Sequence, residues 1–361
     1  MASTKPKGPK RRLEVANPPN PYSSDRIEYV RESEWDPELP VAKLDVFEEE
    51  AKSALSKNTS PDVGFTWSVN PYRGCFHGCA YCYARPTHQY LGHGAGTDFE
   101  RKLIVKTNIA ECLRKHFDKR SWAGETIVFS GNTDCYQPIE GRYGLTRACL
   151  ELCAEYRNPV CVITKSKLVA RDVDVLQELH EFARCHVTFS VPFIDGAMAR
   201  AIEPNAPSPR ARLAAMKTLA DAGIPVGLSL GPIIPGLSEE QIPAILEAAR
   251  DAGASWAFGI LLRLPREVLP VFDERLQANF PMRAKKVRSA LEEMRLGNVQ
   301  EARFGQRMRG HGPRWQTIER LFELHRKRLG LVLREPAFVM DGSAPTTFRR
   351  PETPKAQLTL F

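Results

Sequence analysis

Six short apolar segments, each followed by a helical pattern, constrain the fold of this chain more than any other sequence feature. They are rich in β-branched and aromatic residues and lack polar–apolar alternation, which is typical of strands buried on both faces. The segments cover residues 65–69, 126–129, 160–164, 187–191, 226–230 and 256–262. After the first unit they recur about every 30 residues, the spacing of βα units. We therefore expect an α/β fold with a largely parallel sheet.

The stretches between these segments carry helix signals. Residues 210–222 place apolar side chains on one face, and the pattern ends at Gly223. The sequence Ser-Glu-Glu-Gln at residues 238–241 is a capping-box pattern and predicts a helix that ends near Gly253. No G-x-G-x-x-G follows any of the strands, which argues against a dinucleotide-binding sheet. Six strands with right-handed crossovers then favour a partial (β/α)6 TIM-like barrel.

Both ends of the chain differ from this central part. Residues 1–45 are basic and proline-rich with little apolar patterning, so we expect a disordered tail or an extended wrap around the domain. The expected organisation is this tail, a core barrel over residues 46–275, a basic helical extension over 276–340 and a flexible tail over 341–361.

The extension carries a strong positive charge. Residues 283–334 hold 14 Lys and Arg against five Glu, an excess larger than the net charge of +8 of the whole chain. Four arginines surround a glycine-rich stretch beside Trp315, namely Arg303, Arg307, Arg309 and Arg314. Arginines next to an aromatic ring suit a phosphate backbone and a stacked base. The alternative is a solvated helix face packed on the barrel.

Cysteine usage indicates the compartment. The chain has nine cysteines, an odd number, and its start is basic but lacks the apolar stretch of a secretory signal. It also lacks an apolar run long enough to span a membrane. We therefore expect a cytoplasmic protein whose cysteines are thiols or metal ligands and not a disulfide framework.

The most informative segment, residues 70–83, reads Asn-Pro-Tyr-Arg-Gly-Cys-Phe-His-Gly-Cys-Ala-Tyr-Cys-Tyr. Its cysteines, Cys75, Cys79 and Cys82, have the spacing C-x3-C-x2-C directly after the first predicted strand. Three thiolates this close can bind three irons of a cubane cluster and leave the fourth iron open. The alternatives are a zinc site and chance. A zinc site would take its fourth ligand from His77, His88 or His93. A redox pair of Cys79 and Cys82 would leave Cys75 unexplained.

With Tyr81 before its last cysteine, this segment resembles the C-x3-C-x-aromatic-C signature of the radical SAM superfamily. The resemblance implies a partial (β/α)6 barrel with the motif on the loop after the first strand. It also implies two cofactors, a [4Fe–4S] cluster and S-adenosylmethionine. In that family one-electron reduction splits the sulfonium and makes a 5′-deoxyadenosyl radical, which abstracts a hydrogen atom from the substrate.

The resemblance extends to the polar or glycine- and proline-containing ends of four later strands. These ends are residues 130–134, 163–166, 189–192 and 231–236, and they resemble the spore photoproduct lyase-like branch. By this match the cofactor-binding residues would be Tyr81, Asn132, Asp134, Lys165, Ser190 and Pro232. A lysine ammonium suits the cofactor carboxylate. The alternatives are a surface ion pair for the lysine and simple turns for the strand ends.

Two residues are catalytic candidates by the same resemblance. In the lyase, the tyrosine after the last cluster cysteine is linked to radical relay, which makes Tyr83 a candidate here. The lyase also has a hydrogen-donor cysteine at the place that Gly131 occupies in this chain. Cys135 lies four residues further on and would be a substitute donor only if its turn directs it inward. The general chemistry therefore carries over, whereas the spore-product reaction does not.

The remaining cysteines have two interpretations. Cys149 and Cys153 share a helix face, and with Cys161 they would make a second metal site. The favoured interpretation is that these residues, together with Cys112 and Cys185, are buried as small hydrophobic side chains.

The last five residues resemble the peptide by which bacterial replication and repair proteins bind the DNA polymerase sliding clamp. Gln357, Leu358, Leu360 and Phe361 match that Q-L-[SD]-L-F pattern, and Thr359 replaces its Ser or Asp. Such a peptide places a few apolar anchors in a preformed groove. The alternative is a tail that docks on its own domain.

Together these features predict a radical SAM enzyme that acts on DNA by lyase-like repair or base modification. The implied partners are DNA, the sliding clamp and an electron donor such as flavodoxin or ferredoxin. A second hypothesis is radical modification of RNA or protein. A non-enzymatic hypothesis is a DNA-binding adaptor of the clamp with a structural iron–sulfur or zinc site.

Overall fold

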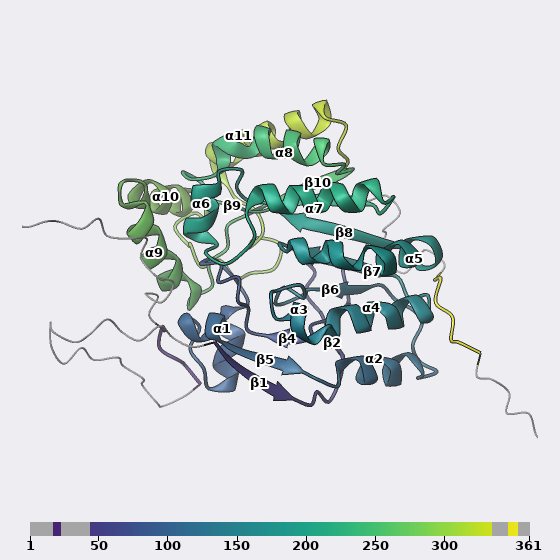
Figure 1. Ribbon diagram of the computed structural model, residues 1–361. Coiled ribbons are helices and arrows are strands. Elements are labelled where there is room, and N and C mark those ends of the chain that lie inside the picture. The colour runs from purple at the N-terminus through teal and green to yellow at the C-terminus, as the bar shows by residue number, and fades with distance from the viewer. Residues whose placement is uncertain (1–16, 23–43, 334–345, 353–361) are drawn as a thin grey trace, which may run out of the picture.

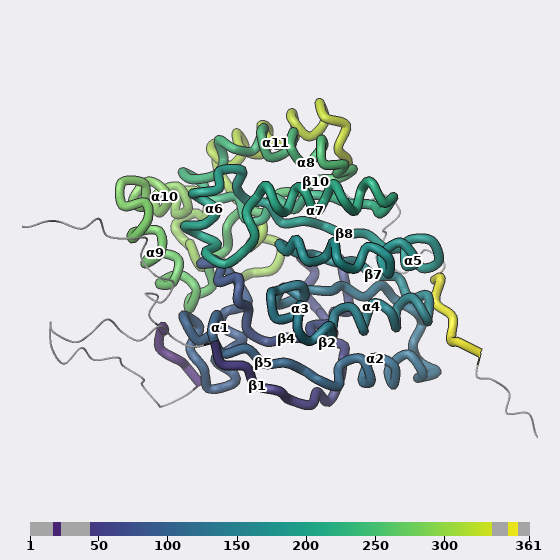
Figure 2. Tube along the Cα trace, in the orientation of Figure 1, coloured from purple at the N-terminus to yellow at the C-terminus, as the bar shows by residue number. Residues whose placement is uncertain are grey.

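The computed structural model describes residues 17–22, 44–333 and 346–352 (Figure 1). Its strands form a sheet of seven strands and a smaller sheet of three. The helices that connect the strands of the larger sheet lie side by side along its outer face, as the trace in Figure 2 also shows. No helix in these three ranges is long and apolar enough to cross a bilayer.

The larger sheet is an open, partial barrel. Its strands are β2 (Leu55–Lys57), β3 (Trp67–Val69), β6 (Ile127–Phe129), β7 (Val160–Thr164), β8 (Cys185–Ser190), β9 (Val226–Ile233) and β10 (Trp256–Leu261). They follow the order β10-β9-β8-β7-β6-β3-β2. All neighbours pair in parallel except β2, which is antiparallel to β3. The six predicted strands and the partial barrel are therefore confirmed.

Helices alternate with these strands along the chain. Up to β8 they are η1 (Arg85–Leu91), α1 (Thr97–Arg101), α2 (Ile109–Phe117), α3 (Glu140–Tyr143), α4 (Leu145–Glu155), η2 (Lys167–Asp172) and α5 (Val173–Ala183). After β8 come α6 (Gly196–Ile202), α7 (Pro209–Asp221), η3 (Glu239–Gln241) and α8 (Ile242–Asp251). The last helices are α9 (Val268–Asn279), α10 (Pro281–Met294) and α11 (Gly312–Arg328).

The apolar strand segments fill the interior of the barrel. Phe129, Phe189 and Leu228 are fully buried, and α7 closes the core with Met216. This burial explains why the strands lack polar–apolar alternation, because both faces of each strand are covered.

The capping-box prediction at residues 238–241 is wrong. The Ser238 hydroxyl accepts from the backbone N–H of Ile234 over 2.9 Å, so it is not available to cap the helix. The Glu239 carboxylate likewise accepts from the N–H of Gly236. These polar groups stabilise the preceding loop, and the α-helix begins at Ile242 after a short 3₁₀ turn.

The three-stranded sheet has no counterpart in the sequence prediction. It consists of β1 (Asp45–Glu49), β5 (Lys102–Lys106) and β4 (Tyr72–Arg73), in that order. Its strands were missed because β4 has two residues and β5 has three apolar residues between lysines. Tyr72, Leu103 and Val105 pack in a small core of their own beneath this sheet. The sheet matters for the site because β4 leads directly into the cysteine segment.

Parts of both terminal regions lie against the domain. In the N-terminal region, Asn20 donates to the carbonyl of Gln89, and Gln89 donates to that of Pro19. In the C-terminal region, residues 346–350 contact the loops that precede β6, β7 and β8. The rest of the predicted N-terminal tail and the terminal peptide over 353–361 lie outside the described residues.

Candidate metal centre

Three thiols lie on one loop at the C-terminal end of the parallel strands. Cys75, Cys79 and Cys82 follow β4 and precede η1, and all three are free thiols. Cys75 and Cys79 are each 7% exposed, and Cys82 is half-buried. Since parallel strands end on the same side, this loop shares its side of the barrel with the ends of β6 to β10 (Figure 1).

The buried guanidinium of Arg85 fixes the shape of this loop. It donates to the carbonyl oxygens of Gly78 and Cys79, each over 3.0 Å, and to two carbonyls of the segment before α1. It also pairs with Glu100 over 2.5 Å. The two side chains are 0% and 1% exposed, so each charge depends on the other for compensation. The sequence gives no signal for this role beyond an arginine close to the motif.

Two glycines of the motif are required because other parts of the protein lie very close to their backbone. Gly74 and Gly78 have φ angles of +73° and +66°, which favour glycine. A Cβ at Gly74 would lie 2.8 Å from the carbonyl oxygen of Lys102, and one at Gly78 would lie 2.9 Å from the Glu100 carboxylate. Any side chain at either position would therefore displace the loop.

Two amide side chains tie the loop to later parts of the barrel. Gln137, which follows β6, accepts from the N–H of Phe76 over 2.8 Å and donates to the carbonyl of Gly74 over 3.0 Å. Asn205, which follows α6, donates to the carbonyl of Phe76 over 2.8 Å. Because these contacts come from distant parts of the chain, the thiols are held in place by the folded barrel.

A buried carboxylate lies beside the middle cysteine. Glu203 is hydrogen-bonded to the Tyr81 phenol and pairs with Arg212 over 2.5 Å, and its Oε1 lies 4.0 Å from the Cys79 Sγ. Burial raises the pKa of Glu203, but the positive charges of Arg212 and Lys165 outweigh it, so the pKa is lowered. The carboxylate therefore stays ionised next to the loop. Sequence reasoning missed Glu203 and Arg212, which lie outside the strand ends.

Lys165 lies just after the end of β7, with its ammonium near the Tyr81 ring. Its Nζ lies 5.8 Å from the centre of the Tyr81 ring, and among the described residues no carboxylate lies within ion-pair distance of it. The expected alternative, a surface ion pair, is therefore not formed there. A half-buried ammonium without a partner can meet an incoming carboxylate.

The other predicted cofactor residues lie at the same ends of the strands. Asn132 follows β6 and is held by a hydrogen bond from its N–H to the Asn70 side chain, 3.0 Å long. Ser190 ends β8 and is buried, and its carbonyl accepts from Arg212 over 2.9 Å. Pro232 is buried within β9, which extends further than predicted.

Asp134 connects three parts of the site. It accepts from the Thr164 hydroxyl over 2.8 Å and from the N–H of Lys165 over 2.7 Å, and its Oδ2 lies 3.4 Å from the His77 Nδ1. Burial would raise its pKa, but these contacts, led by His77, hold the pKa of Asp134 at about 2. Both of its oxygens are in use, so its observed role is to position Lys165 and the cysteine loop.

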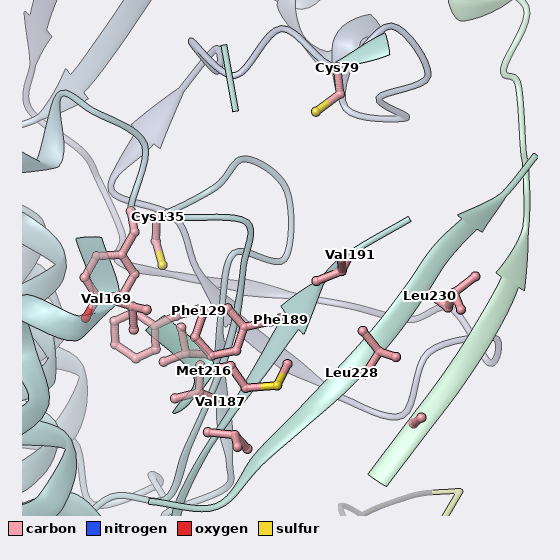
Figure 3. Close-up of a cluster of buried hydrophobic side chains, with 14 of the residues drawn as sticks. Cys79, Phe129, Cys135, Val169, Val187, Phe189, Val191, Met216, Leu228 and Leu230 are labelled. Carbon is pink, nitrogen blue, oxygen red and sulfur yellow. The ribbon is translucent and has the colours of Figure 1, made fainter. Parts of the chain in front are cut away.

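The two catalytic candidates have different surroundings. Tyr83 is 52% exposed, and its phenol donates to the carbonyl of Gly131 over 3.0 Å. Cys135 is 1% exposed, and burial together with the Asp134 carboxylate raises the pKa of its thiol. Figure 3 shows the Cys135 sulfur directed toward the apolar cluster near Phe129, whereas Cys79 lies apart on its loop. The turn thus directs the Cys135 thiol into the apolar core and not toward an open face of the barrel. This is not the orientation that a substitute hydrogen donor would need.

The remaining cysteines are core residues. Cys149 and Cys153 are fully buried on α4, Cys161 and Cys185 are buried on β7 and β8, and Cys112 is half-buried on α2. Within the described ranges, no three His, Cys, Asp or Glu side chains are close enough to hold a single metal ion. The burial of four of these residues in the core, with Cys112 packed against it, supports their interpretation as small hydrophobic side chains.

The predicted arginine cluster is largely neutralised within the protein. Arg303 pairs with Glu301, Arg307 with Asp62, and Arg314 with Glu239 and Glu293. Trp315 is 6% exposed and packs in the core, so the expectation that it stacks on a base is wrong. Of the four arginines, Arg309 is exposed and has no ion pair in the described part of the chain.

Comparison with known proteins now identifies the family. The sequence model of the radical SAM superfamily matches residues 69–249, which is half of the chain. This chain belongs to the radical SAM superfamily. Its family cofactors are a [4Fe–4S] cluster and S-adenosylmethionine, as the cysteine motif predicted. The matched range contains the three motif cysteines and all the strand ends up to β9.

Curated relatives support the same assignment. An uncharacterized protein of Mycobacterium tuberculosis is 37% identical over 217 residues, covering 59% of this radical SAM chain and 64% of the relative. An uncharacterized protein of Methanocaldococcus jannaschii is 29% identical over 242 residues, or 66% of this chain and 85% of the relative. The match thus spans less than two thirds of the mycobacterial relative.

Solved structures show the same fold. A spore photoproduct lyase in complex with dinucleoside spore photoproduct aligns with a TM-score of 0.55 and 18% identity. The alignment covers 80% of this radical SAM chain and 81% of the lyase. A mutant of such a lyase aligns over the same shares with a TM-score of 0.56 and 18% identity. The partial barrel and much of its periphery are therefore common to both folds.

The residues of this radical SAM protein fit the family cofactors. Burial raises the pKa of the Cys79 thiol and Glu203 raises it further, whereas Lys165 lowers it. Burial also raises the pKa of Cys82. Buried thiolates need a compensating positive charge, which iron supplies. Zinc needs ligands that converge on one ion. Of the candidate histidines, His88 contacts the Lys102 carbonyl over 2.9 Å, and the His77 Nδ1 lies 3.4 Å from the Asp134 Oδ2. Thiolates of a cube bind different irons and need no such convergence.

Proposed function

We propose that this protein cleaves S-adenosylmethionine reductively at a cluster held by Cys75, Cys79 and Cys82, and that its substrate is DNA. The reaction class is lyase-like repair or base modification. When bound and reduced, the cluster would supply the one electron that splits a carbon–sulfur bond of S-adenosylmethionine, which would give methionine and the radical that takes a hydrogen atom from the substrate. An electron donor such as flavodoxin or ferredoxin would supply that electron.

One observation carries the cofactor part of this proposal. Three free thiols and the unpaired ammonium of Lys165 occupy the same end of a partial barrel, joined through Tyr81 and Asp134. In our assignment Lys165 binds the methionyl carboxylate of the cofactor. Asp134 holds the backbone of Lys165, and Tyr81 keeps Glu203 beside the loop. Asp134 and Tyr81 thus hold Lys165 and Glu203 in position before the reaction begins.

Ser190, Pro232 and Asn132 are assigned to cofactor binding because each lies at or just after the C-terminal end of a barrel strand. Ser190 would contact the ribose, and the segment containing Pro232 would line the adenine. Asn132 has a side-chain amide without a hydrogen bond among the described residues, so it can bind a ligand. Tyr83, which is exposed at the same end, remains the candidate for relaying a radical between cofactor and substrate.

Charge supports DNA as the substrate. The net charge is +8, and several cations near this end of the barrel are exposed and have no ion pair in the described ranges: Arg283, Lys285 and Lys286 on α10, and Arg309. Figure 1 places α10 on the same side as the cysteine loop and α1. Unpaired cations on the side of the active site attract a polyanion and position its backbone.

We further propose that Gln357, Leu358, Leu360 and Phe361 bind the sliding clamp. Support comes from the segment before them. Phe348 packs on Phe117 and Tyr156, and Arg350 donates to the carbonyls of Phe117 and Lys119. These contacts lie at the end of the barrel opposite the cysteine loop (Figure 1). A partner bound beyond residue 352 would therefore leave the proposed active site open to DNA.

The cysteines also support the proposed cytoplasmic location. All nine are free thiols in the structure. Free thiols in this number persist in a reducing compartment.

The proposed function is tested by comparing nucleic acids as activators. The reconstituted protein is incubated anaerobically with S-adenosylmethionine and dithionite, alone or with ultraviolet-irradiated DNA, intact DNA or RNA. Formation of 5′-deoxyadenosine is measured in each case. We expect irradiated or modified DNA to give the largest increase and a chemically altered base. Stimulation by RNA alone, or by no nucleic acid, would contradict DNA as the substrate.

A further inference from the structure

Arg263 is a half-buried arginine without a partner at the open end of the barrel. It lies two residues after β10, at the end where barrel enzymes build their sites. Its guanidinium makes no hydrogen bond or ion pair with any residue in the described ranges. The nearby arginines differ, since Arg307 pairs with Asp62 and Arg303 pairs with Glu301. A half-buried guanidinium that uses none of its donors on the described part of the protein is available to an incoming anion such as a phosphate.

The surroundings of Arg263 make an excess of positive charge. Its electrostatic neighbours are Arg307, Arg295, Tyr83 and Asp62. The Asp62 carboxylate is already used, because it accepts from the N–H of Gly305 over 2.6 Å and from the Arg307 guanidinium. Burial lowers the pKa of Arg263, and the charge of Arg307 lowers it further. Arg263 and Arg307 therefore share the Asp62 carboxylate, and the buried Arg295 nearby adds a further positive charge.

Hydrogen bonds hold the backbone next to Arg263 in place before any ligand binds. The buried side chain of Arg295 donates to the carbonyl of Leu262 over 2.8 Å and to that of Arg309 over 2.7 Å. It thereby holds the loop after α10 against the end of β10, next to Arg263. Gly310 allows this close approach, since a Cβ there would lie 3.0 Å from the Leu261 side chain at the end of β10 and 2.6 Å from the Trp315 ring on α11.

Two exposed aromatic rings lie next to arginines of this group, Tyr83 near Arg263 and Phe304 beside Arg307. Tyr83, 52% exposed, is an electrostatic neighbour of Arg263, and Phe304 is 57% exposed. The guanidinium of Arg307 lies 4.5 Å from the centre of the Phe304 ring. Exposed rings beside a positive charge are typical of sites for unpaired nucleotides, where bases stack on rings and phosphates meet cations.

We propose that Arg263 binds a backbone phosphate of a single-stranded or locally opened DNA segment, with Tyr83 and Phe304 available to its bases. This inference rests on the proposed function and assigns the substrate contact within it. Arg263 would hold the strand beside the cysteine loop, so that the target nucleotide can reach the cofactor. Its role is binding and not proton or hydrogen transfer.

The test uses the reconstituted full-length protein and a fluorescent oligothymidylate of a few nucleotides. Binding is measured by anisotropy over a series of salt concentrations, and binding of S-adenosylmethionine is measured separately. Arg263→Ala should weaken oligonucleotide binding about tenfold and lower the salt slope by about 0.7, the value for one phosphate contact on a single strand. Arg263→Lys should retain part of the affinity. Arg303→Ala is the matched control, because Arg303 is exposed and already paired with Glu301.

Other outcomes would overturn the proposal. Equal oligonucleotide binding by Arg263→Ala and the wild type would remove Arg263 from the DNA site. Loss of S-adenosylmethionine binding with unchanged oligonucleotide binding would assign Arg263 to the cofactor carboxylate. A wild-type protein that binds no oligonucleotide would reject the DNA function itself, which separates that failure from the first two. Arg263 makes no ion pair within the described residues, so the variants should fold, and thermal unfolding checks this.

Discussion

The phenol of Tyr83 donates a hydrogen bond to the backbone carbonyl of Gly131 over 3.0 Å. It connects the residue after the last motif cysteine to Gly131, just beyond the end of β6. The absence of a side chain there has a steric cause, because a Cβ at Gly131 would lie 2.6 Å from the Ser68 Cβ. A side chain therefore cannot be accommodated at position 131 without a change at Ser68.

Substitution of Gly131 should destabilise the fold. Gly131→Ala forces its methyl group against Ser68 on β3, and overpacking of this kind costs about 1–3 kcal/mol. Chemical denaturation of the variant measures this loss in the free energy of unfolding. The double variant Gly131→Ala with Ser68→Gly removes the opposing Cβ and should recover most of it. An alanine variant as stable as the wild type would contradict the close approach of Gly131 and Ser68.

Removal of Arg85 should release the cysteine loop. Arg85→Ala leaves Glu100 buried without its partner and frees the carbonyls of Gly78 and Cys79. Breaking a buried ion pair on one side costs about 3–5 kcal/mol. We expect a loss of stability of this size and poor iron incorporation on reconstitution.

A second variant separates charge from geometry at the same site. Arg85→Lys keeps the positive charge but cannot make all the hydrogen bonds of the guanidinium. It should recover part of the stability and only a small part of the iron content. If Arg85→Ala binds iron as well as the wild type, the loop does not depend on this residue.

Acid stability should depend on His88. Burial, together with the nearby His93, lowers the pKa of His88 from 6.5 to about 4. Between these values the unfolded chain binds a proton at this ring and the native state does not, so stability falls as the pH is lowered from 6.5 toward 4. His88→Gln removes this contribution. Denaturation at pH values across this window should show a steeper loss for the wild type, and parallel curves would refute the assignment.

The terminal peptide should bind the sliding clamp through Phe361. Phe361→Ala removes an aromatic anchor, which costs about 2 kcal/mol or more at an interface of this kind. We expect clamp affinity to fall at least about tenfold in a surface-binding assay, while cleavage of S-adenosylmethionine is unchanged. Thr359→Ser restores the more common residue and should bind at least as well as the wild type. Equal binding by Phe361→Ala would eliminate the proposed anchor.

The partial barrel and its cysteine loop could be predicted because each rests on a local pattern. Buried parallel strands give uninterrupted apolar segments, and the predicted boundaries of β7 are those of the structure. The spacing of Cys75, Cys79 and Cys82 predicted the loop and the family. The cofactor-binding role of Lys165 stays a prediction, and its ammonium lies 5.8 Å from the centre of the Tyr81 ring.

The features that sequence reasoning missed depend on contacts between distant residues. Arg85 and Glu203 act through partners brought together by the fold, and a charged residue in the sequence does not reveal its own burial. The same cause explains the error at Trp315, which is adjacent to arginines in sequence but packs in the core. Arg263 could not be distinguished from the other arginines until their ion pairs were known.

The central claim is that Cys75, Cys79 and Cys82 hold a cluster that cleaves S-adenosylmethionine. The most direct measurement is 5′-deoxyadenosine formation by the anaerobically reconstituted protein with dithionite, together with its iron and sulfide content. We expect the wild type to form the product and Cys79→Ala to lose it. Cys112→Ser, at a half-buried cysteine far from the motif in sequence, should retain it. An iron-free or zinc-bound wild type without cleavage, or full activity in Cys79→Ala, would contradict the claim.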